Sequence, residues 1–235
     1  MTNESGTIPD AEPLAAASDL AAALRELIEV SVTTTVGAGE VRAAADAVRG
    51  AAERLAVARR PVEQVSALDD LSTGQRVFNM VSGAGSALAP PLRYRREEGG
   101  LVGEATLGVA YEGPPSFVHG GMSALLMDQV LGDTAAEAGV WGMTAHLELD
   151  YRGPLPIGEP LVLRGRVGES NGRKSLIVGT IARAAAPDEV LVEARGLFVT
   201  PRREKLEAYF GRITDASGAR RTPDRTGDAT ALPED

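Results

Sequence analysis

Apolar positions recur with a helical period between Gly120 and Gly139, which predicts one long helix. Its apolar face also carries one acid, Asp128, which lies three, four or seven residues from Ala124, Leu125, Leu131 and Ala135. A separate polar stripe holds Gln129, Asp133 and Glu137. Because a carboxylate on an apolar face is costly to bury, Asp128 is either paired, solvated or retained for chemistry.

Alternating apolar residues predict strands on both sides of this helix. The predicted strands are Leu101–Tyr111, Thr144–Tyr151, Pro160–Glu169, Lys174–Ala185 and Val190–Val199. The turns predicted between the last four are Gly153-Pro154, Asn171-Gly172 and Pro187-Asp188. Short connections favour antiparallel pairing, so the pattern predicts an α+β unit with one antiparallel sheet against a single helix.

Three segments of the chain differ in pattern. Residues 1–62 form an N-terminal helical extension, with a loose tail over 1–13 and helices over Leu14–Val30 and Gly39–Arg60, the second ended by Pro61. The extension is either a helical hairpin packed on the main domain or a mobile appendage. The main domain is assigned to residues 63–210, with a short helix over Glu204–Phe210, and residues 211–235 read as a disordered tail.

Composition narrows the class of protein. The chain has 235 residues, of which 43% are hydrophobic, and a formal net charge of −9, which argues against nucleic-acid binding. With no Cys and two His, neither a thiol nucleophile nor a metal site is expected. No apolar run is long enough to span a membrane and the first residues are acidic, so we expect a cytoplasmic protein without stable membrane association.

The start of the central helix is a candidate oxyanion site. Free N–H groups and the helix dipole favour negative charge there, and Gly120 and Gly121 let a substrate carbonyl approach the backbone closely.

Three motifs in order closely resemble acyl-CoA thioesterases of the phenylacetate-pathway (PaaI) type. They are EGPPSFVHGGMSALLMD (Glu112 to Asp128), TAHLELDYRGPLPIGE (Thr144 to Glu159) and the Gly172 to Lys174 turn. The resemblance implies the hotdog fold, in which an antiparallel sheet wraps around one long central helix. It also implies an acyl-CoA substrate and no cofactor.

The resemblance assigns roles to particular residues. Gly120 would bind the thioester carbonyl, Asp128 would attack or activate water, and Thr144 would assist. Gly121 could add a second backbone donor, and His119 leads into the glycine pair. Many relatives carry Asn or Gln seven residues before the first glycine, where this chain has Gly113.

Spacing along the helix predicts a dimer. Eight residues separate Gly120 from Asp128, roughly 12 Å at about 1.5 Å per residue. One carbonyl cannot meet both groups, so we predict an obligate two-fold homodimer with two composite sites. Whether dimers pair further into a dimer of dimers stays open.

Candidate substrate contacts follow from charge and from the resemblance. Arg152, Arg173 and Lys174 could meet the CoA phosphates, or could be ordinary surface cations. Phe117 and Met143 could line the acyl pocket, or belong to the core.

We weigh three functions. The first is hydrolysis of an acyl-CoA thioester, with a medium- or long-chain fatty acyl group favoured and an aryl group not excluded. The second is a non-catalytic acyl-CoA binding or sensing module, although no basic recognition helix accompanies it. A hydratase would need an Asp-His pair on the central helix, which the sequence lacks.

Overall fold

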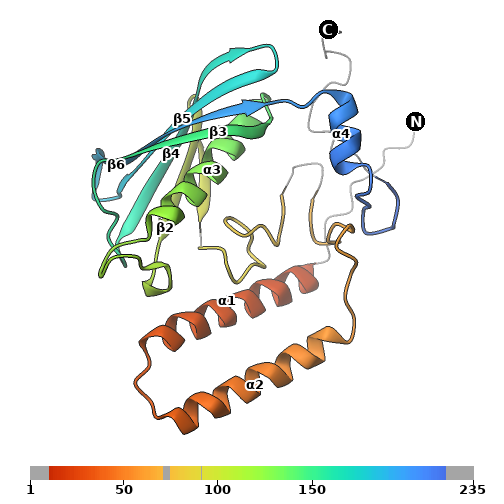
Figure 1. Ribbon diagram of the computed structural model, residues 1–235, viewed down its shortest axis with the longest axis vertical. Helices are drawn as coiled ribbons and strands as arrows, with labels where there is room; N and C mark the ends of the chain where they lie inside the picture. The colour runs from red at the N-terminus through yellow and green to blue at the C-terminus, as the bar shows by residue number, and fades with distance from the viewer. Residues whose placement is uncertain (1–10, 71–74, 91, 221–235) are drawn as a thin grey trace.

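The computed structural model describes residues 11–70, 75–90 and 92–220. Six antiparallel strands form one sheet in the order β1-β2-β4-β5-β6-β3, with helix α3 (Gly120–Glu137) against one face (Figure 1). The strands are β1 (Arg93–Glu97), β2 (Gly100–Thr106), β3 (Met143–Tyr151), β4 (Pro160–Asn171), β5 (Lys174–Arg183) and β6 (Ala186–Val199). This is the hotdog arrangement that the resemblance implies, and the predicted fold class is confirmed.

The core lies between α3 and the middle of the sheet. Side chains that are fully buried in it include Leu126, Met127, Val130 and Leu131 from α3, and Leu161, Leu163, Ile177 and Ile181 from β4 and β5. Burial of each such side chain contributes about 1.5–3 kcal/mol. A Cβ on Gly165 would lie 2.1 Å from Thr134 Oγ1, so glycine at this position lets α3 approach the sheet closely.

The predicted polar stripe on α3 is confirmed, and it faces other parts of the protein. Asn79 Nδ2 donates to Gln129 Oε1 at 3.0 Å, and Gln129 Nε2 donates to Asp133 Oδ2 at 2.9 Å. Glu137 forms a 2.7 Å ion pair with Arg96 of β1. The stripe therefore orients α3 relative to residues 75–90 and to the first strand.

Two predictions around the strands are wrong. The strand expected over Leu101–Tyr111 ends at Thr106 and is followed by a 3₁₀ helix, η1 (Val109–Tyr111). The turn expected at Pro187-Asp188 lies at Ala184-Ala185, and residues 187 and 188 belong to β6. The register shifts there, because Arg183 pairs with Ala186 while Ala182 pairs with Val190. Proline is tolerated in a strand at such an irregularity.

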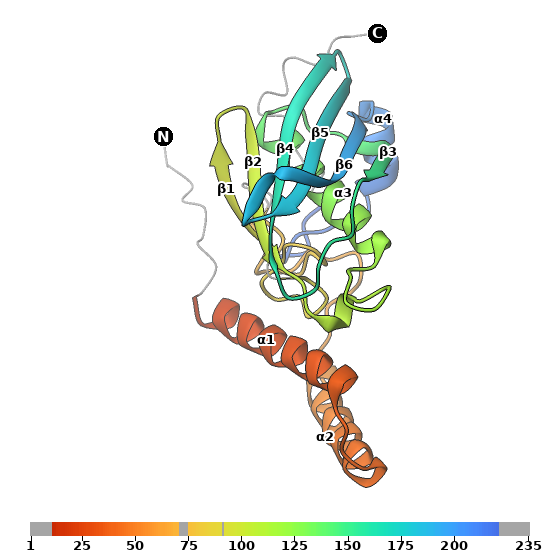
Figure 2. The same cartoon turned by 90° about the vertical axis from the view of Figure 1, so that its left-hand side faces the viewer.

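Two helices form the N-terminal part. They are α1 (Ala11–Thr33) and α2 (Ala38–Ala56), which confirms two helices although α2 ends before the predicted Arg60. Pro13 lies in the first turn of α1, where its missing N–H has no partner to lose. Both views place α1 next to the sheet domain and α2 farther out (Figures 1 and 2). Accordingly α2 has no buried residue, whereas α1 contacts η1.

The C-terminal helix α4 (Arg203–Phe210) is confirmed. Residues 211–220, which we assign to the tail, form turns that reach back to residues 63–65. The N–H of Thr214 donates to Glu63 O at 3.0 Å, and the N–H of Val65 donates to Thr214 O at 2.8 Å. The division at residues 62 and 210 stays a prediction, and residues 1–10 and 221–235 lie outside the described part.

Candidate active site

Helix α3 begins with a histidine cap. His119 has extended backbone angles (φ −61°, ψ 132°), and its Nδ1 accepts the N–H of Gly121 at 3.0 Å. The N–H of Met122 donates to His119 O at 2.8 Å. Among the described residues, the N–H of Gly120 has no acceptor. Of the two predicted backbone donors, Gly120 is therefore the one available to a ligand, while Gly121 is engaged by the imidazole.

The loop before α3 holds His119 in place by backbone contacts. The N–H of His119 donates to Tyr111 O at 2.9 Å, and the N–H of Val118 donates to Leu155 O at the same distance. A Cβ on Gly113 would lie 2.8 Å from His119 Cα. This loop therefore has little space for a larger side chain at residue 113, such as the amide that the resemblance associates with this position.

Asp128 and Thr144 lie together at the other end of the site. The Thr144 hydroxyl donates to Asp128 Oδ1 at 2.8 Å. Asp128 is half-buried and Thr144 is exposed. The carboxylate is thus both paired and accessible to solvent, and its second oxygen stays open to a water molecule or a substrate.

A β-bulge directs Thr144 towards α3. The pairing of β3 with β6 shifts between Thr144 and His146, which leaves Ala145 as the extra residue. Thr144 pairs with the buried Phe198, and Leu147 pairs with Gly196. Side chains alternate between faces along a regular strand, so residues 144 and 147 could share the helix-facing side only through this extra residue.

Tyr151 is a site residue that we did not predict. Its hydroxyl donates to Gly120 O at 2.9 Å, and its ring lies over the start of α3. The sequence places Tyr151 beside Arg152 in the second motif, but nothing in a strand pattern shows which helix turn it reaches. The contact appears because α3 and β3 run in opposite directions.

The predicted catalytic and acyl-contact residues, together with Tyr151, fall into two clusters within one chain. The helix-start cluster comprises His119, Gly120, Gly121, Tyr151 and the neighbouring Phe117. The carboxylate cluster comprises Asp128, Thr144 and Met143. They are separated by about 12 Å along α3, so a single chain does not bring the oxyanion donor and the carboxylate to one carbonyl.

The candidate CoA contacts divide in the same way. Arg152 follows the helix-start cluster and forms a 2.7 Å ion pair with Glu193, and this hydrogen bond lowers the pKa of Glu193. Lys174 pairs with Val199, which in turn pairs with Met143, so it lies near the carboxylate cluster. The guanidinium of Arg173 donates to Thr200 O at 2.9 Å.

Within residues 11–70, 75–90 and 92–220, no group of three or more His, Cys, Asp or Glu side chains is placed to hold a metal ion. Over the same residues, no helix combines the length and the apolar character needed to cross a bilayer.

Comparison with known proteins gives consistent matches. Residues 116–190 match the family model described as the thioesterase superfamily. The crystal structure of a thioesterase superfamily protein is 35% identical with a TM-score of 0.69, and the match covers 78% of this chain and 94% of that chain. That coverage extends beyond the sheet and α3 into neighbouring segments.

Curated relatives match over less than half of this chain. Acyl-coenzyme A thioesterase THEM4 of Xenopus laevis is 33% identical over 108 residues, which cover 45% of this chain and 47% of that protein. THEM4 of Mus musculus is 34% identical over 92 residues, 39% of either chain. The chain thus spans less than half the length of these relatives.

Proposed function

Because the chain belongs to the thioesterase superfamily, we propose that it hydrolyses acyl-CoA thioesters to a free acid and CoA at a site shared between two subunits. The observation that carries the proposal is the hydrogen bond from Thr144 to Asp128, which fixes one carboxylate oxygen and leaves the other free. The N–H of Gly120, which has no acceptor among the described residues, supplies the complementary donor. No cofactor is needed for this chemistry.

In the proposed reaction, the N–H of Gly120 donates to the thioester carbonyl and stabilises its developing negative charge. Asp128 of the partner subunit either deprotonates a water molecule that attacks the carbonyl carbon, or attacks that carbon itself to form a mixed anhydride that water then hydrolyses. The C–S bond then breaks, and CoA leaves as a thiolate that takes up a proton. Thr144 holds the carboxylate in the orientation that the attack requires.

The sheet supports the two-fold arrangement. Among the described strands, β3 pairs with β6 on one side, and its other edge is unpaired. Antiparallel pairing of β3 with its copy would place the Met143 end of one chain beside the Tyr151 end of the other. The helix-start cluster of one subunit would then meet the carboxylate cluster of the next. A homodimer is therefore part of the proposal, and a dimer of dimers stays a prediction.

The same pairing would join the divided CoA contacts. Arg152 of one subunit would approach Arg173 and Lys174 of the partner, and together they would meet the phosphates of CoA. Phe117 and Met143 would likewise come together at the acyl end. We propose a medium- or long-chain fatty acyl group, with an aryl group as the alternative that the test distinguishes. The cytoplasmic location expected from the sequence stays a prediction.

The direct test is thiol release from a panel of short-, medium-, long-chain and aryl-CoA thioesters. Because the chain has no Cys, its own residues give no thiol background. Asp128→Asn should lower kcat by about 10² to 10⁴ while substrate binding persists. Glu148→Gln is the matched control, since Glu148 is an exposed acid on β3, the strand that carries Thr144, and pairs with Arg195.

Two outcomes would overturn the proposal. Wild-type turnover that persists in a folded Asp128→Asn variant would remove the carboxylate from the chemistry. Saturable acyl-CoA binding without turnover in the wild type would instead indicate the sensing module.

A further inference from the structure

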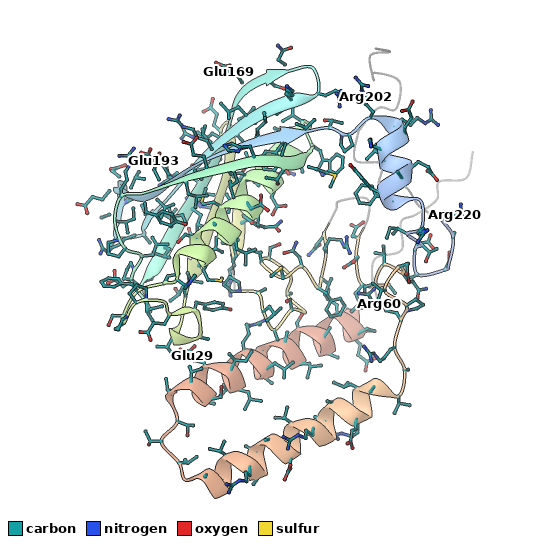
Figure 3. The ribbon with its side chains drawn as sticks, viewed as in Figure 1. Glu29, Arg60, Glu169, Glu193, Arg202 and Arg220 are labelled. Carbon is teal, nitrogen blue, oxygen red and sulfur yellow. The ribbon has the colours of Figure 1, made fainter. Side chains whose placement is uncertain are left out.

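Glu29 of α1 contacts η1 across the interface between the N-terminal helices and the sheet domain. Its carboxylate accepts the N–H groups of Val109 at 3.0 Å and of Ala110 at 3.2 Å (Figure 3). The N-cap residue of η1 is Gly108, which has no side chain to satisfy them. A carboxylate distant in sequence therefore caps this 3₁₀ helix, as Asp or Ser does locally at other helices.

Gly108 provides the space for this carboxylate. A Cβ on Gly108 would lie 2.5 Å from Glu29 Oε2 and 2.6 Å from Oε1. The backbone of Gly108 is in an ordinary extended conformation (φ −83°, ψ −177°), which any residue adopts. Close approach of Glu29, and not backbone strain, is thus the structural reason for glycine at this position.

The capped 3₁₀ helix leads directly to the candidate active site. Its last residue, Tyr111, provides the carbonyl that accepts the N–H of His119 at 2.9 Å. His119 is the residue that caps α3 and precedes Gly120. A chain of hydrogen bonds therefore runs from Glu29 through η1 to the start of α3.

A second contact fixes the same surface of α1. The guanidinium of Arg25, one helical turn before Glu29, donates to Ser86 O at 2.7 Å. Tyr111 Oη donates to Leu88 O at 3.3 Å. Residues 86–88 and η1 are therefore bonded to each other, and both are bonded to α1. The helix is held by directed polar contacts at both places.

We propose that Glu29 is a positioning residue for thioester hydrolysis, which holds η1 and thereby the direction of the Gly120 N–H. The inference rests on the proposed function, and it makes α1 part of the catalytic unit. The oxyanion donor acts only when it points at the developing charge, so a small displacement of His119 and Gly120 weakens catalysis. The CoA contacts lie on other elements and keep their positions.

The expected signature is a separation of kcat from KM. Glu29→Ala should lower kcat about tenfold with KM changed by less than about twofold. Glu29→Gln should recover part of the loss, because its amide oxygen still accepts one N–H. Glu26→Ala is the matched control: Glu26 lies exposed on α1, and its side chain forms no hydrogen bond or ion pair with another described residue.

Gly108→Ala tests the same contact from the opposite side. The added methyl group should displace the carboxylate and reproduce the effect of Glu29→Ala. The double variant should then resemble either single variant, because both remove one interaction. If the losses in kcat of the two single variants multiply in the double variant, the substitutions act independently and the proposal is wrong. Because Gly108→Ala leaves α1 itself intact, it also covers the case in which Glu29→Ala does not fold.

Amide hydrogen exchange separates this proposal from the proposed function. In Glu29→Ala, exchange at Val109, Ala110 and His119, whose N–H groups are hydrogen-bonded in this chain of contacts, should accelerate relative to wild type and to Glu26→Ala. A wild type without thioesterase turnover would overturn the function and leave this exchange pattern as the test of the coupling. Unchanged exchange at η1 and α3, or an unchanged kcat in an active enzyme, would overturn the role of Glu29.

Discussion

The hydroxyl of Thr144 donates a 2.8 Å hydrogen bond to Asp128 Oδ1 and so joins the middle of α3 to the beginning of β3. The contact depends on the bulge at Ala145, which places residue 144 on the helix-facing side of the sheet. It leaves Asp128 with one oxygen fixed and one open. Such an arrangement suits a group that must meet a reacting atom in a defined orientation.

Thr144→Val should lower kcat about tenfold, because the isosteric side chain keeps the packing and removes the hydrogen bond that orients Asp128. Thr144→Ser retains the hydroxyl and should keep most of the turnover. Thiol release under saturating acyl-CoA measures both. Full activity in a folded Thr144→Val variant would show that the hydroxyl is not used.

Gly120→Pro removes the backbone N–H that we assign to the oxyanion. Proline is favoured at the first position of a helix, and the extended backbone of His119 suits a residue before proline. The variant should therefore fold and lose about 10² to 10³ in kcat, the range for removal of one oxyanion donor. Circular dichroism checks that the variant folds, and thiol release measures its kcat.

Gly120→Ala is the control for that experiment. It keeps the N–H, and its Cβ would lie 3.5 Å from the Tyr151 ring, an ordinary contact. It should retain most of the turnover. If Gly120→Ala and Gly120→Pro lose activity equally, steric access and not the N–H limits the reaction.

Periodic segments were the predictable part of this fold. The helix that begins at Gly120 and the four strands after it follow from spacing, because each buries one face of a regular element. β1 was missed, since its sequence RYRRE has no alternation of apolar residues. Its polar side chains instead form ion pairs, such as Arg96 with Glu137.

Contacts between elements were the unpredictable part of the candidate site. The sequence indicated Gly120 and Asp128 and the distance between them. It did not indicate which groups form hydrogen bonds around them. Tyr151 reaches Gly120 O only because the chain folds back between α3 and β3. The cap that His119 forms on Gly121 is local, but the sequence does not show how its side chain is oriented. Glu29 lies 80 residues from Val109, so no local pattern could connect them.

The buried hydroxyl of Tyr94 leads us to expect that the protein becomes less stable at alkaline pH. Burial of this hydroxyl, followed by the negative charge of Asp133, raises the pKa of Tyr94 well above its ordinary value of 10.0. Above pH 10.0 the hydroxyl of Tyr94 loses its proton in the unfolded state and keeps it in the folded state. The free energy of unfolding should therefore fall as pH rises above about 10, by up to about 1.4 kcal/mol per pH unit for this group.

Tyr94→Phe removes the titrating hydroxyl and should flatten that fall. Urea unfolding on both sides of the tyrosine pKa measures the slope, and Tyr209→Phe serves as the control because Tyr209 is 55% exposed on α4. Equal slopes in wild type and Tyr94→Phe would show that Tyr94 does not govern the alkaline limit.

The composite site makes a prediction that no single variant can test. Asp128→Asn and Gly120→Pro should each be inactive as homodimers. In the heterodimer of the two, one site combines the intact Gly120 of one subunit with the intact Asp128 of the other. Purified through two different affinity tags, this heterodimer should recover about half of the wild-type turnover.

Pairing a wild-type subunit with the double variant Gly120→Pro/Asp128→Asn gives the decisive control. Each composite site would then contain one altered group, so this heterodimer should be inactive although one of its chains is fully wild type. If each site were built within one chain, the two results would be reversed: the first heterodimer would be inactive and the second would show about half of the wild-type turnover. The pair of measurements therefore decides whether Gly120 and Asp128 act on one carbonyl across the subunit interface, which the separation of about 12 Å along α3 requires.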